Sequence, residues 1–222
     1  MRKFFLASTL WVFALPLAAD LDFDFAGHHY RIVTTGAPWA TARANAEAAL
    51  YRDRTGQLCI IKSEAENQAV FNSGVAAGVD TISNDGGGGI YFWLGGTDNS
   101  GDLPAASEGE FFWIDGTQFW QGGPPPAAGG TGTVFPGAFE RFSAREPDDF
   151  GAGQDYAVMS INGWVFGVAS DWNDVAGTSF LDYCIEWEFE VLFADGFESG
   201  DTVAWTSTQQ GRSPDRPTSD SE

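Results

Sequence analysis

The segment from Arg145 to Tyr156, REPDDFGAGQDY, places several carboxylates around a single proline. Like charges this close raise the free energy of a folded chain unless a cation or hydrogen-bond donors offset their repulsion. Calcium binds six to eight oxygens from carboxylates, amide carbonyls, backbone carbonyls and water, so such a group suits it. A solvated acidic turn is the alternative interpretation, because Pro, Asp and Gly are ordinary turn formers. Taken alone, the segment predicts either a hard-cation site or an exposed turn.

The charge of the whole chain limits its partners. The formal net charge is −20. Nucleic acids and anionic membranes bind basic surfaces, so we expect neither as a partner. A strongly acidic surface instead favours hard cations such as Ca²⁺.

The two cysteines, Cys59 and Cys184, lie far apart in the sequence and belong to no CxxC or Cys/His cluster. Zinc is therefore a poor candidate by this pattern. An oxidising compartment would permit a disulfide between them. Two buried free thiols are the alternative, because cysteine also packs as a small apolar residue.

The first 19 residues have the layout of a secretory signal peptide. Basic residues precede an apolar run from Phe4 to Leu15, and small residues follow. The run is too short for a comfortable membrane span, so we expect no transmembrane segment and a secreted or periplasmic mature chain. The polar C-terminal part has no apolar period and is predicted to be largely disordered. The expected division is a signal peptide at 1–19, one domain at 20–191 and a tail at 192–222.

Two helices are expected early in the chain. The stretch from Trp39 to Asp53 is rich in alanine and follows a proline, which favours a helix whose inner stripe includes Trp39, Ala42, Ala46 and Ala49. Ser63 and Glu66 have the spacing of a capping box, which indicates the start of a second helix.

Aromatic-rich strands are expected before and after these helices. His28 and His29 are neighbours in the first strand and point to opposite faces, so we do not interpret them as a metal-binding pair. Helices early and strands later indicate an α+β domain with antiparallel sheet and long loops. The expected strands are 28–34, 58–61, 90–96, 111–114, 155–160, 163–169 and 180–191.

The order of several motifs resembles that of a C-type lectin-like domain, in particular the exported bacterial type. The resemblance covers roughly residues 27–188, and its motifs are HHY, PWATARANAEA, GQLCIIKSEAEN, FWLGGTD, EGEFFWIDG, REPDDFGAGQDYAVM, DWND and YCIEWE. It implies two helices flanking two small antiparallel sheets, with a long loop region that carries the ligand site.

The resemblance also implies a calcium site in that loop region. The family's metal ligands fall on two segments of this chain, and they correspond here to Glu146, Asp148, Gln154, Asn173 and Asp174. The family has a cis proline between the first two ligands, which implies a cis Pro147. Three carboxylates and two amides match the oxygen donors that calcium takes.

The resemblance leaves open which class of ligand binds at that calcium. Family members bind sugar hydroxyls there, each between an amide donor and a carboxylate acceptor. In this chain Asp148 and Gln154 depart from the usual residues, so acceptors and donors no longer alternate. The expected partner is a glycan or glycoprotein, with a protein or other surface as the alternative. The tryptophans of these motifs are expected in the core, with Trp172 as the one that contacts ligand.

The resemblance also bears on the cysteines and on catalysis. At the places of the family's usual disulfide this chain has Ala46 and Ile185, and Cys59 and Cys184 lie beside them, which implies a relocated disulfide. A glycosidase acting through two of the acidic residues is a third hypothesis. The sequence has no recognisable Ser/His or Cys/His arrangement, and carboxylates that bind calcium make poor general acids, so we expect no catalytic activity.

Overall fold

The computed structural model describes residues 19–151 and 153–189. The chain divides into two compact units, Met1–Glu188 and Phe189–Glu222, and the second lies outside the described residues apart from Phe189. The predicted tail at 192–222 and the predicted signal peptide, except Ala19, therefore also lie outside the described residues.

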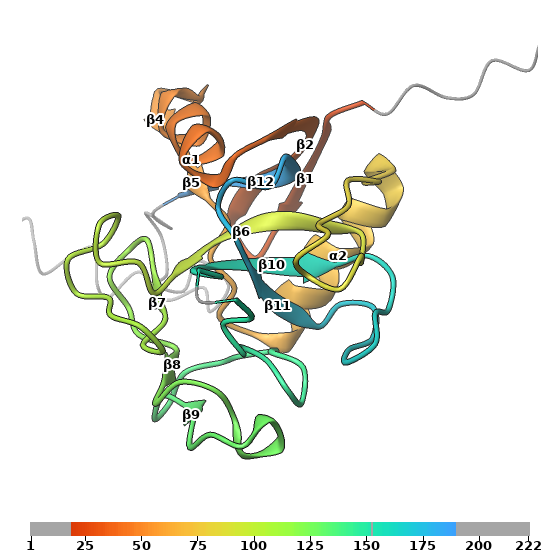
Figure 1. The fold of residues 1–222 in the computed structure, drawn as a ribbon. Helices are drawn as coiled ribbons and strands as arrows, with labels where there is room; N and C mark the ends of the chain where they lie inside the picture. The colour runs from red at the N-terminus through yellow and green to blue at the C-terminus, as the bar shows by residue number, and fades with distance from the viewer. Residues whose placement is uncertain (1–18, 152, 190–222) are drawn as a thin grey trace, which may run out of the picture. The chain divides into compact units, whose positions relative to one another are not determined.

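The described residues of the first unit form two α-helices, a short 3₁₀-helix and twelve strands (Figure 1). The helical elements are α1 (Trp39–Ala48), α2 (Glu64–Ala77) and η1 (Pro126–Ala128). The strands are β1 (Leu21–Phe25), β2 (His28–Ala37), β3 (Leu50–Tyr51), β4 (Arg54–Thr55), β5 (Gln57–Leu58), β6 (Tyr91–Thr97), β7 (Phe112–Trp113), β8 (Trp120–Gln121), β9 (Thr133–Val134), β10 (Tyr156–Ser160), β11 (Trp172–Val175) and β12 (Leu181–Glu188).

Eight of the strands form one mixed sheet. Its order is β1-β2-β12-β6-β10-β11, and β5 and β7 pair with β12 and β6. The pairing of β12 with β6 is parallel, and the other pairings in this sheet are antiparallel. The resemblance implied two small antiparallel sheets. The parallel contact joins what would be two sheets into one, and two further two-stranded antiparallel sheets, β3-β4 and β8-β9, lie outside it.

Residues at the helix ends determine where the two helices begin and end. Helix α1 follows Pro38 and ends at Ala48, after which Ala49 is extended. The Ser63 side chain accepts a hydrogen bond from the Glu66 amide at 3.2 Å and caps α2, which ends at Gly78 in the left-handed conformation that glycine adopts without steric cost.

The helices cover opposite faces of the sheet. Alternate residues of a strand point to opposite faces, and Trp187 of β12 donates its indole N–H to the Ala49 carbonyl after α1, at 3.2 Å. Tyr30 of β2 donates its hydroxyl to Glu66 of α2, at 2.7 Å, from the other face. Figure 1 shows the strands passing between α1 and α2.

Aromatic side chains and the disulfide fill the core. The tryptophans of the recognised motifs, Trp93, Trp113, Trp172 and Trp187, are all at most 2% exposed. Cys59 and Cys184 form a disulfide with a Cα–Cα separation of 5.3 Å, which confirms the predicted pairing. The disulfide joins the segment after β5 to β12, at the centre of the large sheet.

The structure departs most from the sequence predictions at two elements. The first helix stops at Ala48 because the chain turns there into the β3-β4 hairpin, so Leu50 and Tyr51 are in a strand. The strand predicted at 163–169 is wrong. Those residues form a loop that the Ser160–Asp171 backbone hydrogen bond closes, and its apolar side chains are exposed rather than paired in the sheet.

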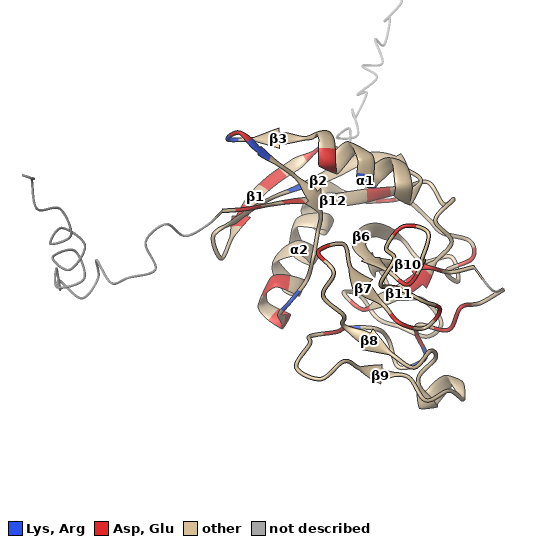
Figure 2. Cartoon of the chain, turned by 90° about the vertical axis from the view of Figure 1, so that its left-hand side faces the viewer, with Lys and Arg blue, Asp and Glu red and all other residues tan. Residues whose placement is uncertain are grey.

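Acidic residues outnumber basic ones over the described part of the chain, and Figure 2 shows them along the loops near β7, β10 and β11. Among the described residues, no helix has the length and hydrophobicity of a membrane span.

Candidate functional site

Three carboxylates predicted as metal ligands lie together at the β11 edge of the sheet. One oxygen from each of Glu146, Asp148 and Asp174 lies within 4.8 Å of the others. Asp174 is on β11, and its two oxygens accept the backbone amides of Asp148, at 3.2 Å, and Asp149, at 2.9 Å. These bonds hold the acidic loop against the strand. The Glu146–Pro147 peptide bond is cis, as the resemblance implied.

The two predicted amide ligands line the same place. Gln154 Oε1 accepts the Phe150 amide at 2.6 Å, and its Nε2 donates to the Asp85 carbonyl at 3.0 Å. Asn173 Oδ1 accepts the Asp174 amide at 3.0 Å, and its Nδ2 lies 3.3 Å from the Tyr91 hydroxyl. Each carbonyl oxygen keeps a second lone pair for a cation. Each NH₂ group uses one of its two hydrogens inside the protein.

A cavity of about 210 Å³ opens beside these groups. Glu146, Asp148, Gln154 and Asn173 line its polar side. Phe150, Val165 and Phe166 line its mouth and are 71%, 76% and 40% exposed. The cavity therefore joins oxygen donors to an apolar rim.

Trp172 does not belong to this surface. Its side chain is fully buried, and its indole N–H donates to Asn67 Oδ1 at 2.8 Å. Asn67 lies on α2, so the indole connects β11 to the helix. This corrects the expectation that Trp172 contacts ligand, because the indole is buried in the core and bonded to α2.

The donor set fits a hard cation. Glu146 Oε2 is buried without a hydrogen-bond partner, and an unpaired buried carboxylate oxygen is costly. Burial, followed by the charge of Asp148, raises the pKa of Glu146 to about 7. Burial and the charge of Glu146 raise the pKa of Asp174 well above its usual value. A calcium ion would supply both the missing partner and the missing positive charge, and oxygen-only donors suit calcium better than zinc or copper.

These shifts predict how stability depends on pH without calcium. Between about pH 4.5 and pH 7 the folded chain holds more protons on Glu146 and Asp174 than the unfolded chain does, so the free energy of unfolding should fall as pH rises. The raised pKa values of Asp98, about 7, and Asp182, about 6, act in the same direction. Urea unfolding in chelator at pH 5 and pH 7 measures the effect. A chain that is more stable at pH 7 would contradict it.

A second acidic group lies in the same loop region. Oxygens of Glu108, Asp149 and Asp155 are within 4.8 Å of one another. The Asp155 carbonyl accepts the amide of Asp98, whose carboxylate is 3% exposed and has one oxygen without a partner. Sequence reasoning missed this group because Glu108 comes from a loop far in sequence from the segment that holds Asp149 and Asp155. The loop region thus offers two sets of oxygens able to bind cations.

Asp85 and Trp164 are further residues of the cavity that sequence reasoning missed. The Asp85 side chain accepts the Ala176 amide at 2.6 Å, so the glycine-rich loop at 86–89 is fixed to the end of β11. Trp164 comes from the loop that was predicted as a strand, and its indole nitrogen is buried without a partner. An acidic residue before four glycines was the available signal for Asp85, whereas Trp164 gave none.

Comparison with known proteins gives similarity at the level of structure. No protein-family model matches the sequence, and no curated protein matches it. The C-type lectin CEL-I from Cucumaria echinata is similar with a TM-score of 0.54 and 20% identity, over 76% of this chain and 96% of that one.

Two carbohydrate-recognition domains are similar to the same extent. That of the mouse scavenger receptor C-type lectin gives a TM-score of 0.51 and 19% identity, over 76% of this chain and 96% of that one. That of cow CD23, determined in the presence of a GlcNAc2Man3 oligosaccharide, gives 0.50 and 20%, over 80% and 98%. At these identities the similarity establishes the fold.

Proposed function

We propose that this chain, which has the C-type lectin-like fold, is an exported, calcium-dependent carbohydrate-binding module without catalytic activity. The observation that carries the proposal is the meeting of Glu146, Asp148 and Asp174, of which Glu146 and Asp148 line a cavity that reaches solvent. Calcium held there would use its remaining coordination positions for two hydroxyls of a sugar. The cow CD23 domain, determined with an oligosaccharide, supports a glycan as the ligand class. The disulfide supports an oxidising, extracytoplasmic compartment.

A binding role agrees with the state of the carboxylates. A general acid must release its proton to a substrate, whereas carboxylates bound to calcium are ionised and held in place. Lectin domains are also among the solved structures to which the chain is similar. The proposed role is therefore recognition.

A protein or other partly apolar surface is the second candidate ligand. One observation favours it. The exposed rim of Phe150, Val165 and Phe166 would bury apolar surface against a partner. The NH₂ groups of Gln154 and Asn173, by contrast, each use one of their two hydrogens within the protein, which leaves one hydrogen apiece to donate to a sugar hydroxyl.

A glycan array with calcium and with chelator tests the proposal. Under the carbohydrate hypothesis, a defined set of glycans binds with calcium, and none of this set binds with chelator or to Asp174→Asn. If calcium binds but no glycan does, the protein-surface candidate takes its place. If glycans bind equally in calcium and in chelator, the calcium-dependent carbohydrate hypothesis and the protein-surface candidate are both wrong.

A double variant tests the donor–acceptor argument directly. Asp148→Asn supplies an NH₂ donor, and Gln154→Glu supplies an acceptor, so the pair restores alternation around the ion while the number of carboxylates stays the same. A gained hydrogen bond of about 1–1.5 kcal/mol corresponds to roughly a tenfold gain in sugar affinity. Isothermal titration with monosaccharides measures it, and each single variant is the control. An unchanged affinity in the double variant contradicts the argument.

A further inference from the structure

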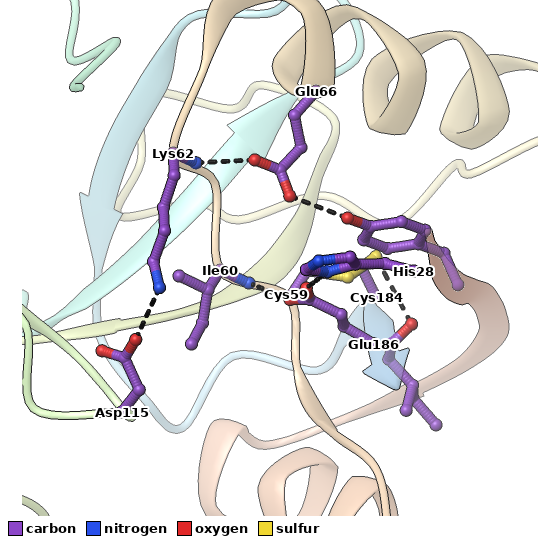
Figure 3. Close-up of polar contacts among 10 residues, drawn as sticks. His28, Cys59, Ile60, Lys62, Glu66, Asp115, Cys184 and Glu186 are labelled. Carbon is purple, nitrogen blue, oxygen red and sulfur yellow. Dashed lines mark hydrogen bonds and ion pairs between the residues drawn. A yellow bond between two sulfur atoms is a disulfide. The ribbon is translucent and has the colours of Figure 1, made fainter. Parts of the chain in front are cut away.

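A third group of side chains able to bind a metal ion lies on the α2 side of the sheet, away from the loop region. His28 of β2, Glu66 of α2 and Glu186 of β12 each place one ligand atom within 4.8 Å of the others. Glu186 pairs across the strands with Tyr30, which puts it diagonal to His28 on the same face. Figure 3 shows the imidazole and the two carboxylates converging beside the disulfide.

The polar neighbours of the two glutamates hold the carboxylates in position. Glu66 accepts the Tyr30 hydroxyl and the Lys62 amide, both at 2.7 Å. Glu186 accepts the Ile60 amide at 2.9 Å with one oxygen and lies 2.5 Å from His28 Nδ1 with the other. These donors leave lone pairs on each carboxylate. Backbone and tyrosine donors that orient carboxylates in this way are typical of the outer shell of a metal site.

The charges of the group do not balance without a cation. Glu66 and Glu186 are 8% and 1% exposed. A protonated His28 would offset one of their two negative charges. The ammonium of Lys62 lies beside the group but bonds to Asp115 Oδ2 at 2.8 Å, as Figure 3 shows. A divalent ion with a neutral imidazole and two carboxylates gives a local charge of zero, which is the arrangement that burial favours.

Access and donor type indicate what the ion would be. A cavity of about 200 Å³ reaches the group past His28, whose side chain is 32% exposed. Imidazole nitrogen is a ligand for zinc and other late first-row metals rather than for calcium. We propose that His28, Glu66 and Glu186 bind a divalent transition metal, with zinc as the best fit, and that water from the cavity completes its coordination.

The change in geometry that this requires is small. At a tetrahedral zinc, two donors each about 2.1 Å from the ion lie roughly 3.4 Å apart. His28 Nδ1 and Glu186 Oε1 therefore need to separate by less than about 1 Å from their present hydrogen bond, and zinc takes the place of the proton between them. This site shares no residue with the proposed calcium site and does not depend on it. Bound zinc would join β2, α2 and β12.

Zinc titration of the full chain, purified after chelator treatment, tests the proposal. The titration is done in millimolar calcium, so that the oxygen sites hold calcium, and is followed by calorimetry and native mass spectrometry. We expect one zinc per chain, with affinity that rises from pH 6 to pH 8 because protons compete for the imidazole. His28→Gln can still donate a hydrogen bond to Glu186 but lacks the metal ligand, and it should weaken zinc binding at least about 100-fold.

The neighbouring histidine provides the matched control. His29 points to the other face, where Nδ1 bonds Asp24 at 2.6 Å and the ring stacks on Tyr51. His29→Gln and Asp174→Asn should keep the zinc. Glu66→Gln, which preserves the size of the side chain, serves as a second variant if His28→Gln does not fold. Absence of a bound zinc in the wild type, or equal affinity in the folded His28 or Glu66 variant, overturns the proposal.

Discussion

Millimolar calcium should raise the melting temperature of this chain by roughly 5–10 °C, and Asp174→Asn should lose the shift. A ligand at a hundred times its Kd stabilises the folded state by about 2.7 kcal/mol, and each kcal/mol raises the melting temperature by roughly 2–4 °C in a domain of this size. Of the three carboxylates in the proposed calcium site, Asp174 is the most buried, and it holds the acidic loop to β11. Differential scanning fluorimetry in calcium and in chelator measures the shift.

Asp171, which begins the DWND motif that Asp174 ends, is the control for this experiment. Asp171 lies outside the three-carboxylate group and bonds the Val168 amide, so Asp171→Asn should keep the calcium shift. In chelator, Asp174→Asn should melt no lower than the wild type, because removing one of three neighbouring negative charges offsets a lost hydrogen bond. An equal calcium shift in Asp174→Asn would rule out the proposed site. No shift in the wild type would rule out calcium itself.

The double variant Cys59→Ala with Cys184→Ala should lower the free energy of unfolding by about 4–5 kcal/mol. The two residues are 125 positions apart, and in the chain-entropy model closing a loop of this length stabilises the fold by that amount. At roughly 2–4 °C per kcal/mol, the melting temperature should fall by roughly 10–20 °C. Urea unfolding of oxidised wild type and of the variant measures the difference.

The reduced wild type separates the crosslink from packing. It lacks the bond but keeps both sulfur atoms, whereas the alanine variant also loses their packing in a core where both cysteines are fully buried. Reduced wild type and variant should therefore both be far less stable than oxidised wild type, with the variant the lower of the two. A difference below about 1 kcal/mol between oxidised and reduced wild type would contradict the loop-length argument.

Local chemistry made the helices predictable from the sequence, whereas the disulfide was implied by the resemblance. Alanine content after Pro38 and the cap at Ser63 each act within one turn, so they needed no knowledge of the tertiary structure. The 163–169 segment failed for the converse reason. Its valines and phenylalanine suit a strand, but the available sheet edge is taken by 172–175, which leaves the apolar residues in an exposed loop. Propensity gives no information about that competition.

Of the candidate metal sites, one was predictable from the sequence and one was not. Glu146, Asp148 and Asp174 were identified because their two motifs stand in a known order. The group of His28 with Glu66 and Glu186 was not, because it depends on which residue of β12 faces which residue of β2. The two adjacent histidines do point to opposite faces, as predicted, yet His28 meets carboxylates from distant parts of the chain. Strand register, which the sequence alone leaves open, decides such clusters.

The strand order has a consequence for how this module can be attached to other things. The strands that begin and end the described domain, β1 and β12, belong with β2 to one half of the large sheet, whereas Glu146 and Asp148 lie in the loop before β10 and Asp174 lies on β11, at the opposite edge. A fusion partner or a surface tether joined before β1 would thus attach at the edge of the sheet opposite the proposed calcium site. The strands β2, β12, β6 and β10 would lie between the tether and the site, which suits immobilised display.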